Sequence, residues 1–250
     1  MSALNRVGKV ALITGSAQRI GAEICNRLHR EGWSVIIHYN RSKNEAQELA
    51  DKLNASAPNS ARIVAGDLLQ KDGCHAIAVN ALNAFGRIDT LINNASTSPT
   101  DNSLDDEAAW IDLFRCNTFA PYLLMWMLKT ELAKNSGCIV NLLDVRATNL
   151  NPAENWAIYT ATKAALHSLT ISAAKELAPY VRVNAVSPGI TLPFPSEYWD
   201  DETANEMKAR SLLGTTATPS DVADAVCWLT QSKHVTGQVI TVDGGESLRW

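Results

Sequence analysis

Short runs of consecutive hydrophobic residues alternate along the chain with longer segments whose hydrophobic residues recur every three or four positions. The short runs predict buried strands at 10–14, 34–39, 61–65, 90–93, 138–143, 181–187 and 239–242. The amphipathic segments predict helices at 21–31, 43–54, 73–85, 157–178 and 219–229, and one or two more within 104–132. Each predicted strand is therefore followed by helical sequence before the next strand begins.

This alternation predicts an α/β fold, because parallel strands need crossover connections and helices usually supply them. No Pro/Gly/Ser-rich linker divides the chain, so we expect one Rossmann-like, doubly wound domain over 1–250, with helices on both faces of a parallel sheet. The stretch 191–218 interrupts the pattern with Pro193, Pro195 and Gly214 around an acidic helical piece. Such an insertion is typical of a substrate-binding loop or lid, and a plain surface loop is the alternative.

Composition narrows the classes of function. Hydrophobic residues make up 46% of the chain, which is enough for a packed core, and charged residues make up 19%. The net charge is −4 with no Lys/Arg cluster, which argues against nucleic-acid binding. No apolar run approaches the roughly 20 residues of a membrane span, and residues 1–9 lack the apolar core of a signal peptide. We expect a soluble cytoplasmic protein.

The cysteines and histidines predict no metal site and no disulfide framework. There are five of each, and the cysteines, at 25, 74, 116, 138 and 227, form no CxxC pair. No two histidines stand three or four residues apart. The cysteines are therefore expected to be buried free thiols.

A glycine-containing turn follows the first predicted strand, where residues 14–21 read TGSAQRIG. Gly15 and Gly21 would let the backbone approach a pyrophosphate, and the helix that follows would supply amide donors and a favourable dipole. The spacing differs from GxGxxG, so a tight turn without a ligand remains an alternative reading of these residues alone.

The same turn resembles the short-chain dehydrogenase/reductase family, whose usual pattern is TGxxxGxG. Arg19 stands where that pattern has its middle glycine, which is the form of the pteridine reductase branch. The resemblance covers essentially the whole chain, including the TG and DGG turns at 236–237 and 243–245. It implies an NADP-dependent oxidoreductase that forms a homotetramer, with Gly15, Arg19, Ile20 and Gly21 at the cofactor phosphates.

The residues after the second predicted strand indicate which nicotinamide cofactor is used. An NAD site usually carries Asp or Glu there, but no carboxylate appears before Glu45. Arg41 can pair with a 2′-phosphate and Ser42 can donate to it, so we expect NADPH. The alternative is that Arg41 is a solvated surface charge. The stretch also resembles the pteridine reductase branch, and its expected cofactor residues are His38, Tyr39, Asn40, Arg41 and Ser42.

Three further cofactor-binding turns follow from the resemblance, and all lie at the carboxyl ends of predicted strands. Asp67 would accept the adenine amino group, beside Leu68. The NNAS turn contributes Asn94, Ala95 and Ser96. The PG turn places Pro188, Gly189 and Ile190 beside the nicotinamide.

A YxxxK pair is the candidate catalytic unit. Tyr159 and Lys163 stand four residues apart, which puts them on one face of a helix. A nearby ammonium should lower the pKa of the Tyr159 phenol and help it pass a proton to the substrate. The resemblance adds Asn117, which would help hold a proton-relay water, whereas the plainer interpretation is a polar residue that kinks its helix.

Asp144, fifteen residues before Tyr159, is the informative position. Most family members carry Ser here, whose hydroxyl holds a substrate carbonyl oxygen, and a carboxylate would repel an oxygen that gains negative charge. A carboxylate can instead accept from ring N–H groups or join a proton relay, as reduction of a pterin C=N bond needs, and pteridine reductases have Asp here. The alternative is that Asp144 only caps the segment that follows.

The sequence therefore predicts NADPH-dependent reduction of pterins, with a Tyr–Lys–Asp relay and substrate contacts from Arg19, Ser96, Asp144 and Tyr159. Ser98 stands where pteridine reductases often carry a stacking aromatic. Trp156, Tyr198 and Trp199 are candidate replacements, unless they are ordinary packing residues. A carbonyl reductase of the 3-oxoacyl or sugar-ketone type is the runner-up, and a non-catalytic NADP-sensing scaffold is a third hypothesis.

Overall fold

A computed structural model of the chain describes residues 8–98, 106–148, 156–191 and 201–249. Seven parallel strands form one sheet in the order β3-β2-β1-β4-β5-β6-β7. They are β1 (Val10–Ile13), β2 (Ser34–Tyr39), β3 (Ala61–Ala65), β4 (Thr90–Asn93), β5 (Cys138–Leu142), β6 (Arg182–Pro188) and β7 (Val239–Val242). The predicted doubly wound α/β fold is confirmed, and the strand order reverses between β1 and β4.

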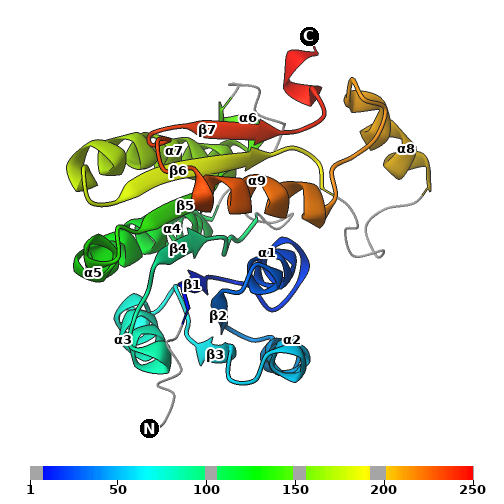
Figure 1. Ribbon diagram of the computed structural model, residues 1–250. Coiled ribbons are helices and arrows are strands. Elements are labelled where there is room, and N and C mark those ends of the chain that lie inside the picture. The colour runs from blue at the N-terminus through cyan, green and yellow to red at the C-terminus, as the bar shows by residue number, and fades with distance from the viewer. Residues whose placement is uncertain (1–7, 99–105, 149–155, 192–200, 250) are drawn as a thin grey trace, which may run out of the picture.

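Helices cover both faces of the sheet (Figure 1). One face carries α1 (Arg19–Arg30), α2 (Lys43–Ser56) and α9 (Pro219–Gln231). The other carries α3 (Gly73–Phe85), α5 (Ala120–Lys134) and α7 (Ala157–Leu177). The segment before α5 consists of α4 (Glu107–Phe114) and the π-helical turn η1 (Arg115–Phe119).

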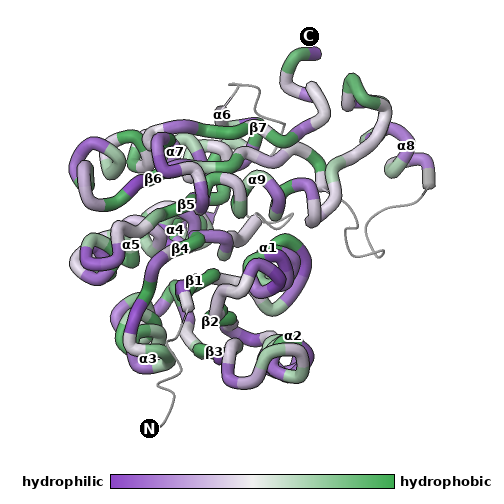
Figure 2. The backbone as a smooth tube through the Cα atoms, in the orientation of Figure 1, coloured by the Kyte–Doolittle hydropathy of each residue, from purple (hydrophilic) through white to green (hydrophobic). Residues whose placement is uncertain are grey.

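Strand β1 shows why the strands read as uninterrupted hydrophobic runs. Its side chains alternate between two cores, with Ala11 and Ile13 packed on the α1 side and Val10 and Leu12 on the α3 side. All four are fully buried, because helices cover both faces of a parallel sheet. In Figure 2 the buried strand β1 is hydrophobic, whereas helix α8 (Asp201–Arg210), which lies at the periphery, is largely hydrophilic.

Several element boundaries differ from the predicted ones by one or two residues, and two short elements were not predicted. Helix α1 begins two residues early, at Arg19, and a short helix α6 (Val145–Thr148) follows β5 directly. A 3-10 turn, η3 (Glu246–Leu248), follows β7. Within the insertion, α8 is the predicted helical piece, and residues 192–200 lie outside the described part of the chain.

The two ends of the insertion meet. Thr191 forms a parallel bridge with Ala217, and the Ala217 amide donates to the Ile190 carbonyl at 3.0 Å. The intervening chain is thus an excursion that starts and ends beside the end of β6. Within the described ranges, none of the helices has both the length and the hydrophobicity of a membrane span.

Candidate active site

The predicted site residues gather at the carboxyl ends of the strands. The turns after β1 and β4 lie where the strand order reverses, and those after β5 and β6 are their neighbours. In open α/β sheets, this switch point is where ligands bind.

The two glycines of the turn are packed too closely to carry side chains. Gly15 has a φ of +60°, and a Cβ there would lie 2.8 Å from the Ala95 Cα. A Cβ on Gly21 would lie 2.6 Å from the Ser16 Cα. The Asn94 amide nitrogen donates to the carbonyls of Thr14 and Gly15, each at 2.9 Å. The side chain of Asn94 therefore holds the turn in shape.

Arg19 occupies a backbone conformation that glycine would adopt more easily. Its φ is +52°, and its side chain is exposed at the first position of α1. A left-handed conformation costs an ordinary residue about 1 kcal/mol. The replacement of the middle glycine by Arg thus places a cation at the helix N-terminus at some cost in backbone strain.

His38 was expected to bind the cofactor, but the structure assigns its ring a different role. The Gly15 amide donates to His38 Nδ1 at 3.0 Å, and Nε2 lies 3.1 Å from the Gly66 carbonyl. Since Gly15 N–H can only donate and the carbonyl can only accept, Nε2 must carry the proton. Burial lowers the pKa of His38 to about 4. The neutral ring supports the turn from behind.

The remaining residues of 38–42 divide between core and surface. Tyr39 is buried in the core beneath α1 and α2, so its side chain is not at the surface that a cofactor would reach. Asn40 and Arg41 are exposed at the end of β2. Ser42 is the N-cap residue of α2, and its side chain makes no capping hydrogen bond. Arg41 and Ser42 thus remain placed to bind a phosphate.

The predicted cofactor-binding turns after β3 and β6 are held in place by hydrogen bonds and close packing. The carboxylate of Asp67 accepts from the Leu69 amide at 3.0 Å, and Leu68 is buried. A Cβ on Gly189, which follows Pro188 at the end of β6, would lie 2.7 Å from the Asp243 Cβ. The Ile190 amide donates to Glu246 Oε2 at 3.4 Å. The C-terminal DGG segment therefore packs against the PG turn.

Tyr159, Lys163 and Asp144 meet as the sequence predicts. The Tyr159 hydroxyl donates to Asp144 Oδ2 at 3.3 Å. Lys163 Nζ donates to the Leu142 carbonyl at 2.9 Å and lies 5.8 Å from the Tyr159 ring centroid. Ser96, from the turn after β4, also lies within hydrogen-bonding reach of the phenol. The ends of two strands, β4 and β5, and one helix, α7, thus converge on one hydroxyl group.

The sequence predicts that Lys163 lowers the pKa of the Tyr159 phenol, and this prediction is wrong for the structure described. Burial, together with the Asp144 charge, raises the pKa of Tyr159. Burial also lowers the pKa of Lys163 to about 8, against the attraction of Asp144. The ammonium is held by the Leu142 carbonyl, while the carboxylate accepts directly from the phenol. Burial first, and the Asp144 charge second, therefore raise the pKa of Tyr159, and the lysine does not offset them.

Asn117 lies in η1 and ties three segments together. Its Oδ1 accepts from the Thr97 amide at 2.9 Å and from the Ser96 hydroxyl at 3.1 Å. Its Nδ2 donates to the Thr97 carbonyl and to Thr162 Oγ1. Asn117 therefore fixes the NNAS turn beside α7, a role that the sequence did not indicate. Its expected contact with a relay water stays a prediction.

Two residues near Tyr159 were given no catalytic role by the sequence. Arg146 Nη1 lies 3.4 Å from Asp144 Oδ2, and its guanidinium lies 5.1 Å from the Trp156 ring centroid. Trp156 meets Tyr159 edge to face at 5.1 Å. Trp156 is thus confirmed as a neighbour of the site, with Arg146 over its ring. Ser98 is exposed, and Tyr198 and Trp199 lie outside the described residues.

Asp144 also caps α6, so the plainer interpretation of this residue holds beside the chemical one. Its Oδ1 accepts from the Arg146 amide at 2.8 Å, and its carbonyl accepts from the Ala147 amide at 3.0 Å. All five cysteines are buried and free. No cluster of three metal-ligating side chains occurs among the residues that the structure places.

Comparison with known proteins agrees with this geometry. The family model described as enoyl-(acyl carrier protein) reductase matches residues 15–247. The chain belongs to the short-chain dehydrogenase/reductase family. It is 36% identical to pteridine reductase 1 of Leishmania tarentolae, covering 96% of both chains. It is 33% identical to the 3-oxoacyl-[acyl-carrier-protein] reductase FabG of Staphylococcus aureus, covering 96% of this chain and 98% of that one. It is also 33% identical to tropinone reductase-like 3 of Erythroxylum coca, covering 97% and 94%.

Membership in this family makes the chain a short-chain oxidoreductase, and its relatives use NAD(H) or NADP(H). The residues present fit such a cofactor. Gly15 and Gly21 leave no room for side chains of their own beside the α1 N-terminus, and the turns after β2, β3, β4 and β6 line the same edge of the sheet.

Proposed function

We propose that this protein is an NADPH-dependent reductase of pterins, converting dihydropterin or pterin toward tetrahydropterin. The proposal rests on the carboxylate of Asp144, which lies 3.3 Å from the Tyr159 hydroxyl. An ionised carboxylate at this point can accept from the N–H groups of a heterocycle, and it would repel the oxyanion of a reduced ketone. The similarity to a pteridine reductase supports the same choice.

The proposed chemistry divides between cofactor and protein. Bound NADPH supplies the hydride. The Tyr159 hydroxyl loses its proton to the substrate, and Lys163 and Arg146 are the cations that offset the charge left on the phenol oxygen. Asp144 orients the substrate by accepting from its N–H groups. Arg19 and Ser96, both exposed at this edge, would contact the substrate from the cofactor side.

The choice of NADPH over NADH rests on the end of β2. Arg41 and Ser42 provide a guanidinium and a hydroxyl donor there, and no carboxylate lies before Glu45. A guanidinium binds a 2′-phosphate through paired hydrogen bonds, whereas a carboxylate would repel it.

Reduction of a carbonyl substrate is the second candidate, and one observation favours it. The Ser96 hydroxyl lies beside the Tyr159 phenol and could donate to a substrate oxygen in place of the family serine. Similarity to a 3-oxoacyl-[acyl-carrier-protein] reductase at 33% identity points the same way. A non-catalytic role is disfavoured, because Tyr159 and Lys163 are both present and in contact with the site.

Substrate choice is tested by NADPH oxidation with dihydrobiopterin, dihydromonapterin, dihydrofolate and an acetoacetyl thioester. We expect turnover of the pterins and not of the thioester. In Asp144→Ser, pterin turnover should fall about 100-fold, because the acceptor for ring N–H groups is lost, and thioester turnover should appear. Asp51→Ser is the matched control, since Asp51 is an exposed carboxylate in the middle of α2. Turnover of the thioester alone by the unaltered enzyme would favour the carbonyl reductase.

We further propose that the enzyme is a homotetramer. Exposed apolar residues on η1, α5 and α7 support this assembly, and η1 and α7 also carry Asn117 and Tyr159. The exposed residues are Phe119, Leu123, Met127 and Ile171.

A further inference from the structure

Arg146 has no role in the proposed chemistry beyond its charge, yet it contacts the catalytic aspartate twice. Its amide donates to Asp144 Oδ1 at 2.8 Å, and its Nη1 lies 3.4 Å from Asp144 Oδ2. The second oxygen is the one that accepts from the Tyr159 hydroxyl. Arg146 therefore restrains both carboxylate oxygens, and its side chain shares one of them with the catalytic phenol.

The guanidinium is itself held in place. It lies 5.1 Å from the Trp156 ring centroid, and Trp156 meets Tyr159 edge to face. Cations within about 6 Å of an aromatic centroid are attracted to the ring face. The side chains of Arg146 and Asp144 are 25% and 15% exposed, so solvent screens the pair only in part. The four side chains form a ring of contacts in the order Asp144, Arg146, Trp156, Tyr159.

We propose that Arg146 is a positioning residue of the reaction, which keeps the Asp144 carboxylate directed at the Tyr159 hydroxyl. The proposal rests on the reductase activity of this site, whichever substrate the site accepts.

The charges around Tyr159 explain why such a residue is needed. Asp144 raises the pKa of Tyr159, after the larger effect of burial, and Arg146 opposes that rise. The other groups facing this pair are Lys163, held by the Leu142 carbonyl, and the Ser96 hydroxyl. Cys116, from η1, faces Lys163. Without Arg146, the carboxylate would lose its adjacent cation, and the phenol would give up its proton less readily.

The test compares Arg146→Met, Arg146→Lys and Trp156→Leu by kcat and KM for dihydrobiopterin and NADPH across pH. In Arg146→Met we expect kcat to fall about tenfold, and the basic limb of the pH profile to move to higher pH, because Tyr159 loses the adjacent cation that lowers its pKa. Arg146→Lys keeps the charge and should restore most of both changes. Trp156→Leu should give a smaller shift in the same direction. KM for NADPH should stay within twofold in all three.

Arg30→Met is the matched control, because Arg30 forms an exposed ion pair with Glu23 on α1 at 3.1 Å, and its loss should change neither kcat nor the pH profile. An unchanged pH profile in Arg146→Met would overturn the proposal. So would an Arg146→Lys variant as impaired as Arg146→Met with an equal loss of thermal stability, since Arg146 would then be structural. If the unaltered enzyme reduces only the acetoacetyl thioester, the pterin assignment fails, and the same variants tested on that thioester still decide the role of Arg146.

Discussion

His38 lies outside the catalytic group, yet the shape of the cofactor turn depends on it. Its neutral ring joins the Gly15 amide to the Gly66 carbonyl, and its own carbonyl accepts from the Ser16 amide at 2.9 Å. Two amides at the start of the glycine turn, those of Gly15 and Ser16, therefore donate to His38. Protonation of the ring would remove the acceptor for Gly15, so the turn depends on His38 staying neutral.

This dependence predicts how stability varies with pH. The pKa of His38 is lowered from 6.5 to about 4 by burial, so the unfolded chain takes up this proton first as the pH falls. Its contribution to the free energy of unfolding should therefore decrease by about 3 kcal/mol between pH 6.5 and 4. In His38→Gln, which can keep both hydrogen bonds and does not titrate, that part of the slope should vanish.

Urea unfolding measured at several pH values checks the His38 prediction. His75→Gln is the control, because His75 is exposed on α3 and should leave the slope unchanged. Parallel stability curves for the unaltered chain and His38→Gln would show that the buried ring is not the source of the pH dependence.

Which catalytic residues meet could be predicted from the sequence, but not how their charges interact. Tyr159 and Lys163 share a helix face by spacing, and Asp144 follows a strand, so their meeting required only the fold. The direction of the Tyr159 pKa depends on depth of burial and on where the Lys163 ammonium is drawn. Neither the burial of Tyr159 nor the position of the Lys163 ammonium can be predicted from the neighbouring residues in the sequence. The contact between Arg146 and Trp156 could not be predicted either, because neither residue belongs to a recognised sequence motif.

At the scale of elements, the π-helical turn η1 positions the NNAS turn. Asn117 makes its four hydrogen bonds from there, to Thr97, Ser96 and Thr162. π-helical turns within α-helices are rare and frequently occur at functional sites. Here the wider turn precedes α5 and holds the Asn117 side chain between the end of β4 and helix α7.

Asn117→Ala should therefore lose both stability and turnover. We expect the free energy of unfolding to fall by about 2 kcal/mol, because the Thr97 amide and carbonyl lose their partner. We expect kcat to fall at least tenfold, because Ser96 is no longer fixed beside Tyr159. Asn135→Ala is a matched control at the opposite end of α5, where the Asn135 side chain also makes four hydrogen bonds. An equal loss of kcat in Asn135→Ala would mean that Asn117 acts only through stability.

Element boundaries were predictable where one physical signal was dominant. β2, β3, β4 and β7 have the predicted bounds, since buried strands of a doubly wound sheet are short hydrophobic runs bounded by polar residues. The four-residue α6 is too short to show a helical period, and the extra residue in the η1 turn leaves the hydrophobic pattern unchanged. The helices within 104–132 could therefore be predicted only as a group.

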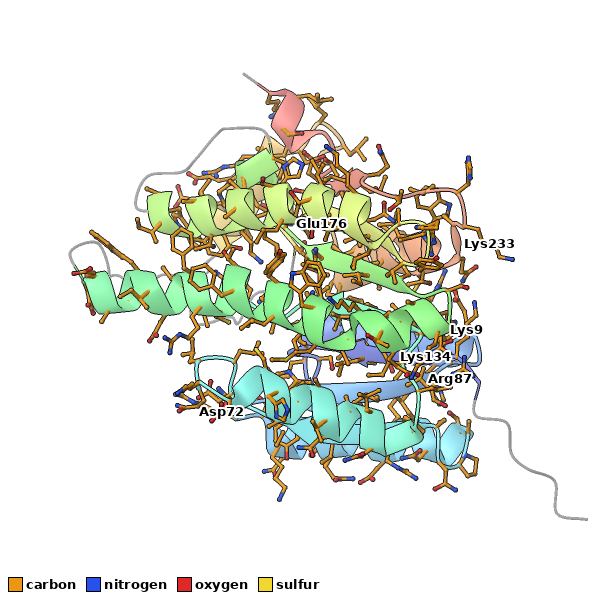
Figure 3. All side chains as sticks on the ribbon, turned by 90° about the vertical axis from the view of Figure 1, so that its left-hand side faces the viewer. Lys9, Asp72, Arg87, Lys134, Glu176 and Lys233 are labelled. Carbon is orange, nitrogen blue, oxygen red and sulfur yellow. The ribbon has the colours of Figure 1, made fainter. Side chains whose placement is uncertain are left out.

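At the scale of the whole molecule, the helical face of α3, α5 and α7 bears on assembly. These helices run side by side across the face in Figure 3. Phe119, Leu123 and Met127 are 53%, 44% and 41% exposed and stand four residues apart, so they form one apolar stripe along η1 and α5. Ile171 on α7 is a further exposed apolar residue of this face. Asn117 and Tyr159 are buried on the inner side of the same segments.

The stripe predicts that single charges on α5 will disrupt the proposed tetramer. Light scattering at micromolar concentration should give four times the chain mass for the unaltered protein. Leu123→Lys and Met127→Lys should each give a smaller assembly, because an unpaired ammonium would have to be buried in the interface. Their kcat should fall as well, since η1 and α5 would lose the packing that holds Asn117 in place. Val79→Lys is the control, because Val79 is a similarly exposed apolar residue on α3, outside the stripe. A monomer mass for the unaltered protein would contradict the tetramer, and kcat would then depend on η1 within a single chain.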